Sequence, residues 1–174
     1  MIACESSPPP EPPPQSQAAL DAMQKLRTGD LEGAVKAYST AIAENPKDAQ
    51  NYINRGIAHN ELGQNPKAIA DYTKALELDP TQILAYFNRA NAHHQMKQYK
   101  EAIDDYTKAL ELEPDSGFAL ANRGATYFAM DQKKEAIADL ESAIQLFTAK
   151  NDSQNSDRLQ KQLDKWKATA TTPS

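Results

Sequence analysis

The chain has 174 residues, which suffices for one domain of ordinary size or for a short array of repeats. Hydrophobic residues make up 40% of it and charged residues 25%, and no apolar run approaches the roughly 18 residues that span a bilayer. The net charge is −5 and no cluster of Lys and Arg is interleaved with aromatic residues, which disfavours a nucleic acid partner. A single cysteine, Cys4, excludes an internal disulfide.

Residues 1–17 are predicted to form a disordered tether. The stretch "ESSPPPEPPPQSQ" at residues 5–17 contains more than half of the prolines of the chain and no large apolar side chain. This composition favours an extended polyproline-type conformation without a packed core.

The first four residues, "MIAC", resemble the cleavage site of a bacterial lipoprotein, in which an apolar and a small residue precede the lipidated cysteine. The resemblance implies a lipid anchor at Cys4 and a place in the cell envelope. No basic start and no apolar signal core precede Ile2, so this interpretation requires a truncated start. The alternative is an ordinary cysteine in a cytoplasmic protein.

Residues 18–150 are predicted to fold as an array of helical hairpins. A 34-residue unit recurs, and its second and third copies are identical at 17 positions. Each copy has two amphipathic stretches separated by a short break, and Pro46, Pro80 and Pro114 stand where the second helix ends. The pattern predicts an all-α solenoid of about four hairpins. The copies span about residues 15–48, 49–82, 83–116 and 117–150.

A capping helix is predicted at residues 151–168. Its core, "SDRLQKQLDKWK", places Leu159, Leu163 and Trp166 on one helical face. The last hairpin of a solenoid has a neighbour on one side only, so a covering helix is expected there. The alternative is a helix that docks on a partner. Residues 169–174 are predicted to be a disordered tail.

The repeated unit resembles the tetratricopeptide repeat (TPR), which has small residues at two fixed positions, then an aromatic residue, an alanine and a proline. The second and third copies match throughout, the fourth lacks the proline, and the first matches in its second half. The matching residues of the second and third copies are Gly56, Ala68, Tyr72, Ala75 and Pro80, and Ala90, Ala102, Tyr106, Ala109 and Pro114. The resemblance implies that the first helices of the hairpins line a concave groove that binds a protein partner.

Asparagine is the sixth residue of three copies, as Asn54, Asn88 and Asn122. The resemblance implies that these side chains point into the groove, like the asparagine ladder with which some TPR proteins hold an extended peptide. A carboxamide donates and accepts hydrogen bonds at once, which suits a peptide main chain of any sequence. The alternative is a set of solvated residues preserved by repeat duplication.

Further groove positions carry apolar and amide side chains. They are Ile53, Ile57, Leu84, Phe87 and Asn91. Apolar side chains of a bound segment would fill pockets while the amides hold its main chain. The alternative is that several residues of this region pack between adjacent hairpins. This alternative applies most to the neighbouring Phe118 and Phe128.

Three arginines and three aspartates recur together at an interval of 16 residues and are predicted to form structural ion pairs. The pairs are Arg55 with Asp71, Arg89 with Asp105, and Arg123 with Asp139. The first copy lacks both members, which suggests pairing across a hairpin or to its neighbour, with bidentate geometry available to the guanidinium. The alternative is an arginine that binds a ligand.

We expect no catalytic site, no metal site and no cofactor. His59 and His93 occupy a core position of the repeat, and His94 diverges from His93 by about 100° around the helix. Glycine-rich phosphate loops are absent from the sequence. The groove also lacks the lysines with which chaperone-binding TPR domains clamp a carboxylate: Leu84 and Phe87 stand at two of those positions.

The sequence therefore predicts a non-enzymatic adaptor or scaffold that binds an extended peptide or a helix of a partner in the groove. One alternative is a structural or self-associating repeat protein of the bacterial cell envelope without a dedicated peptide ligand. Another is a fragment that regulates an enzyme bound to it.

Overall fold

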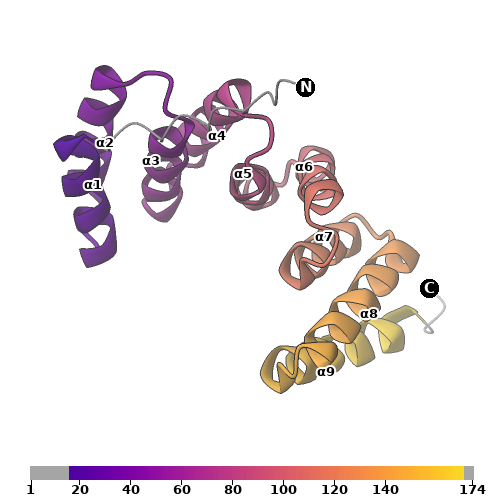
Figure 1. The fold of residues 1–174 in the computed structure, drawn as a ribbon. Helices are drawn as coiled ribbons and strands as arrows, with labels where there is room; N and C mark the ends of the chain where they lie inside the picture. Colours follow the sequence, from indigo (N-terminus) through magenta and orange to yellow (C-terminus); the bar gives the residue numbers. More distant parts are fainter. Residues whose placement is uncertain (1–15, 171–174) are drawn as a thin grey trace, which may run out of the picture.

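The structure is a computed structural model that describes residues 16–170, and this part of the chain contains nine α-helices and no β-strand (Figure 1). The helices are α1 (Gln17–Thr28), α2 (Leu31–Glu44), α3 (Ala49–Glu61), α4 (Asn65–Leu78), α5 (Ile83–Gln95), α6 (Tyr99–Leu112), α7 (Gly117–Ala129), α8 (Lys133–Ala149) and α9 (Ser153–Ala170). The predicted all-α fold is confirmed.

Successive helices pack in pairs and form a row of hairpins (Figure 1). The pairs are α1 with α2, α3 with α4, α5 with α6, and α7 with α8, and α9 packs against α8. The first helices of the hairpins also contact one another in sequence, α1 with α3, α3 with α5, and α5 with α7. We call the face formed by α1, α3, α5 and α7 the groove. The solenoid of hairpins predicted from the 34-residue period is confirmed.

Each hairpin turns through a residue in the left-handed conformation. Gly29 has a φ of 81° and Gly63 a φ of 72°, while Lys97 and Asp131 both have a φ of 60°. These four residues are spaced by one repeat length, so the same backbone turn recurs in all four hairpins. Glycine adopts this conformation without steric cost, whereas Lys and Asp do not.

Small residues and tyrosines allow the helices to approach closely. Tyr38, Tyr72 and Tyr106 are each 1% exposed, and a Cβ added to Gly56 would lie 2.6 Å from the ring of Tyr72. Alanines without any exposed surface line the second helices, at Ala34, Ala68, Ala102 and Ala136. The core is therefore a series of small clusters repeated along the solenoid rather than one central mass.

Helix α9 covers the last hairpin. Leu159, Leu163 and Trp166 are all less than 10% exposed and belong to one cluster with residues of α7 and α8. The ring of Trp166 stacks on that of Phe128, with centroids 4.4 Å apart. The helix continues two residues beyond the predicted boundary at 168, and the hydroxyl of Thr169 donates to the carbonyl of Trp166.

The first helix begins at Gln17, one residue before the predicted start of the array, because the hydroxyl of Ser16 caps it by accepting from the N–H of Ala19. The remainder of the predicted tether, including Cys4, and the residues 171–174 of the predicted tail lie outside the described residues. Among the helices within 16–170, none is both long enough and apolar enough to cross a membrane.

Candidate interaction groove

The three arginines lie between helices, where each forms a bidentate pair with an aspartate. Nε and Nη2 of each guanidinium donate to both carboxylate oxygens of the aspartate 16 residues later, at 2.6–2.9 Å. The arginine side chains are 19–21% exposed and the aspartates 8–11%. The hydrogen bonds to Asp71 raise the pKa of Arg55, and those to Asp139 raise the pKa of Arg123. This geometry favours the structural interpretation over a ligand-binding arginine.

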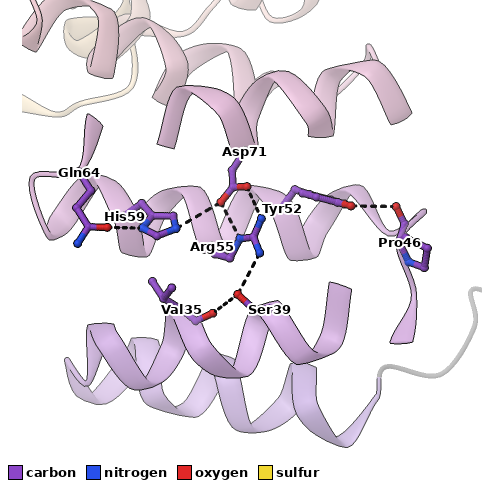
Figure 2. A network of polar contacts seen from close by, with 8 residues as sticks. All are labelled: Val35, Ser39, Pro46, Tyr52, Arg55, His59, Gln64 and Asp71. Atoms are coloured by element: carbon purple, nitrogen blue, oxygen red, sulfur yellow. Dashed lines mark hydrogen bonds and ion pairs between the residues drawn. The ribbon is translucent and has the colours of Figure 1, made fainter. Parts of the chain in front are cut away.

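Each arginine also reaches the preceding hairpin, a contact that sequence reasoning missed. Nη1 donates to a hydroxyl 16 residues earlier in the chain, at 2.9–3.0 Å. The three hydroxyls belong to Ser39, Thr73 and Thr107. Figure 2 shows this arrangement for Arg55, which joins Asp71 of α4 to Ser39 of α2. A hydroxyl residue at the same place in three copies was the available signal.

The fourth copy carries Glu141 at the place of the hydroxyl, and its carboxylate accepts a hydrogen bond from Nζ of Lys167 in α9 at 2.7 Å. The cap is therefore joined to the array through the same repeat position that joins the hairpins to one another.

Two histidines make further polar contacts in the hairpins. Nδ1 of His59 lies 2.9 Å from Oε1 of Gln64 (Figure 2). In the next hairpin, Nδ1 of His93 lies 2.8 Å from Oε1 of Gln98. Burial lowers the pKa of His59, which favours its neutral form. Across residues 16–170 no three His, Cys, Asp or Glu side chains are grouped so that they hold a metal ion.

The three asparagines of the proposed ladder are all partly buried, but their amides have different surroundings. Oδ1 of Asn54 accepts from the side chain of Gln50 at 2.9 Å, and Nδ2 of Asn122 donates to Oδ1 of Asn91 at 3.0 Å. The side chain of Asn88 makes no hydrogen bond to another residue in the described part of the chain. Asn88 therefore keeps its full hydrogen-bonding capacity for a ligand or for water.

Ile53 does not face an open groove, contrary to the expectation. Its side chain is fully buried and packs with Tyr52, Tyr72 and Ala85, because its position faces the junction with the next hairpin. Ile57 is partly buried against the same cluster. Amphipathic spacing alone does not separate these junction positions from the groove positions beside them.

Leu84 and Phe87 line a cleft in the groove that we call the apolar cleft. It has a volume of about 340 Å³ and is lined by Ile83, Leu84, Phe87, Ala109, Glu113, Ser116 and Phe118. It lies between the first turns of α5 and α7, beside the end of α6. Leu84 is 47% and Phe118 50% exposed, although Phe118 also makes an edge contact with Phe147. The apolar cleft therefore presents large hydrophobic side chains to solvent.

A second cavity of about 280 Å³ lies nearer the other end of the same helices, and we call it the amide pocket. It is lined by Asn60, Asn91, His94, Gln95, Tyr106, Asn122 and Ala125. Asn91 and Asn122 were predicted groove residues. Tyr106 was identified from the sequence only as an aromatic residue of the repeat pattern, and its hydroxyl reaches the pocket from α6 to donate to Oδ1 of Asn91.

Models of the tetratricopeptide repeat family match four stretches of the chain. Those described as "Tetratricopeptide repeat" match residues 37–70, 83–116 and 119–149, and one described as "TPR repeat" matches residues 56–97. The matches together cover more than half of the chain. No curated protein matches it significantly in sequence. The chain belongs to the tetratricopeptide repeat family.

Solved TPR structures resemble between about two thirds and nine tenths of the chain. MamA from Desulfovibrio magneticus RS-1 is 19% identical with a TM-score of 0.73, and the alignment covers 91% of this chain and all of that one. The TPR domain of Arabidopsis OM64 is 30% identical with a TM-score of 0.63, over 64% of this chain and 93% of that one.

A third similar structure is the first TPR of Spaghetti (RPAP3) bound to the HSP90 peptide SRMEEVD. It is 24% identical with a TM-score of 0.65, over 66% of this chain and 90% of that one. Proteins of this repeat family are typically interaction modules rather than enzymes. Family and fold together support a protein–protein interaction adaptor with a protein or peptide partner.

Proposed function

We propose that the groove binds an extended segment of a partner protein, with one large apolar side chain of the segment in the apolar cleft. The observation that carries the proposal is the pair of half-exposed side chains, Leu84 and Phe118, on either side of a 340 Å³ cleft. Large apolar side chains are usually covered in a folded monomer, and a contiguous exposed set marks an interaction surface.

The main chain of the bound segment is held by Asn88, which lies one residue after Phe87 on α5. Its carboxamide has both donors and acceptors available, so it pairs with a peptide N–H and a peptide C=O without regard to the side chains. The peptide-bound RPAP3 structure supports the proposal because it shows that a similar array of hairpins holds a peptide.

The proposed ligand differs from the acidic peptide SRMEEVD of that complex. The apolar cleft contains one charged residue, Glu113, and no Lys or Arg. A carboxylate placed there would meet no cation and would lose its hydration, which is unfavourable. We therefore infer that the partner segment is apolar at its anchor rather than acidic.

Selection from a displayed peptide library, with the full chain as bait, tests this function. The selected peptides should bind the double variant Leu84→Ser with Phe118→Ser about tenfold more weakly. Each of the two substitutions removes an apolar side chain that the bound peptide would bury. The matched control is Leu112→Ser, which removes an exposed leucine of α6 that does not line the cleft. Fluorescence polarisation gives the affinities. The proposal fails if no peptide is selected, or if the double variant binds as tightly as the control.

Self-association is the second candidate. Leu20 and Met23 on α1 are 46% and 43% exposed and leave the first end of the groove apolar. In that case light scattering should report a mass that rises with concentration, and the combined change of both residues to Ser should return the chain to a monomer. A mass that stays monomeric at all concentrations excludes this candidate.

A further inference from the structure

The amide pocket contains no ionised side chain. Its lining consists of four amides, one histidine, one tyrosine and one alanine, contributed by α3, α5, α6 and α7. Burial raises the pKa of Tyr106 far above its usual value and lowers the pKa of His94. Both groups are therefore neutral near pH 7, and the pocket binds by hydrogen bonds alone.

The centre of the pocket has unused donors. Oδ1 of Asn91 accepts from the hydroxyl of Tyr106 at 2.5 Å and from Nδ2 of Asn122 at 3.0 Å, so both of its lone pairs are used. The two N–H bonds of Asn91 remain available. Asn122 keeps its side-chain carbonyl oxygen, while its amide group also forms a hydrogen bond with the hydroxyl of Tyr106.

The histidine of the pocket is fixed as a hydrogen-bond acceptor. The hydroxyl of Thr126 donates to the main-chain carbonyl of Asn122 at 2.8 Å, because two oxygens at this distance repel each other without a hydrogen between them. The same hydroxyl lies 2.9 Å from Nδ1 of His94 and has no second hydrogen, so Nδ1 carries the proton. Nε2 of His94 is therefore unprotonated and accepts.

The rim of the pocket adds one acceptor and one pair of donors. Nδ2 of Asn60 donates to Oδ1 of Asn65 at 2.9 Å and to Oε1 of Gln95 at 3.4 Å, which uses both of its hydrogens. Oδ1 of Asn60 and the two N–H bonds of Gln95 remain available. If the side-chain amides of Asn91 and Asn122 were both rotated so that oxygen and nitrogen changed places, their donors and acceptors would change places too. The pocket would still be uncharged and would still offer both donors and acceptors.

We propose that the amide pocket takes an uncharged carboxamide side chain, glutamine or asparagine, from the segment bound in the groove. The proposal rests on the proposed function and names a second residue of the ligand. The carbonyl oxygen of the ligand accepts from Asn91 and Gln95, while its N–H bonds face Nε2 of His94 and the oxygen of Asn122. A carboxylate has no N–H to offer His94 and meets no cation, and an ammonium leaves the donors unpaired.

The pocket also fixes the spacing of the two anchors. Ile83, Leu84 and Phe87 line the apolar cleft, and Asn91, His94 and Gln95 line the amide pocket on the same helix. Their mean separation along α5 is about 13 Å at roughly 1.5 Å per residue, which equals about four residues of an extended chain. The carboxamide is therefore expected about four residues from the apolar anchor.

A nuclear magnetic resonance titration of the full chain with propionamide and with propionate, at pH 7, tests the proposal without a known partner. The two probes have the same shape and differ in charge and in the N–H donors. Propionamide should shift the side-chain amide signals of Asn91 and Gln95 in a saturable way and bind more tightly than propionate. Equal or tighter binding of propionate, or no saturable shift with propionamide, overturns the proposal.

The variant Gln95→Ala should weaken the binding of propionamide about fivefold, because one neutral hydrogen bond is lost. Gln95 is exposed, so the fold is retained, and Gln50→Ala on α3 is the matched control because it removes an exposed amide outside the pocket. Equal weakening by both variants counts against the pocket. The two tests are independent: selected peptides that need Leu84 and Phe118, together with no response to propionamide, refute only this inference.

Discussion

Each of the three arginines joins three helices at one point. Arg89 of α5 binds Asp105 of α6 in its own hairpin and Thr73 of α4 in the preceding one. The side chain also lies over the ring of Tyr86, with the guanidinium carbon 5.8 Å from the centroid. The guanidinium therefore fixes both the angle within a hairpin and the angle between neighbouring hairpins.

Arg89→Ala should destabilise the chain by about 2–3 kcal/mol, because Asp105 then stays nearly buried without a counter-charge. Thr73→Val should cost only about 1 kcal/mol, because valine has a similar shape to threonine and only one neutral hydrogen-bond acceptor is lost. Urea denaturation followed by circular dichroism measures both changes. A double-mutant cycle of Arg89→Ala with Asp105→Ala that shows no coupling would contradict the pairing.

Sequence reasoning identified the aspartates but not the hydroxyls, and the reason is physical. A charged pair leaves a joint signal, because both members are present in three copies and absent from the first. The hydroxyls of Ser39, Thr73 and Thr107 recur in three copies as well, but they left a weaker signal because hydroxyl residues are common on exposed helix faces. The hydroxyl of Tyr106 was also beyond prediction, since its ring occupies a core position while only the terminal oxygen reaches the groove.

At the scale of the element, the turn between the two helices of a hairpin is the same in every copy although its sequence is not. Gly29 and Gly63 suit the left-handed conformation, and Lys97 and Asp131 adopt it at a cost. The position of the turn could therefore be predicted from glycine in the first two copies, and only from the 34-residue period in the other two. Ile53 was misassigned because helical spacing does not distinguish a groove position from a junction position.

Lys97→Gly should stabilise the chain by about 0.5–1 kcal/mol, because the left-handed strain of a side-chain-bearing residue exceeds the entropy that glycine loses on folding. The mirror change, Gly63→Ala, should destabilise it by a similar amount. Thermal unfolding monitored by circular dichroism measures both. A Lys97→Gly variant that unfolds at the same temperature as the wild type, or below it, would show that the turn is not strained.

At the scale of the whole molecule, residues 16–170 have no single hydrophobic core. Its buried side chains form clusters that each involve one or two hairpins, and the cluster at the C-terminal end is completed by α9. The repeat period was enough to predict this architecture, because stacked copies bury their apolar faces against one another. The groove was predicted only in part, since its pockets depend on which amides bond to each other.

Trp166→Ala should therefore act locally. The change removes the ring that stacks on Phe128 and should cost about 3 kcal/mol by the usual loss for a buried aromatic residue. Hydrogen exchange followed by mass spectrometry should show faster exchange in α7 and α8 and little change in α2, because each hairpin contacts only its neighbours. Faster exchange spread evenly over all helices would instead indicate one cooperative unit.

The arginine contacts also make the length of the array adjustable. Each guanidinium donates to a hydroxyl of the preceding repeat, and Thr73 and Thr107 are equivalent acceptors. Excising residues 83–116 would bring Arg123 opposite Thr73, and duplicating them would insert a further identical joint. A chain built on this rule can gain or lose one repeat in a single genetic event and keep the arginine contact at each hairpin junction.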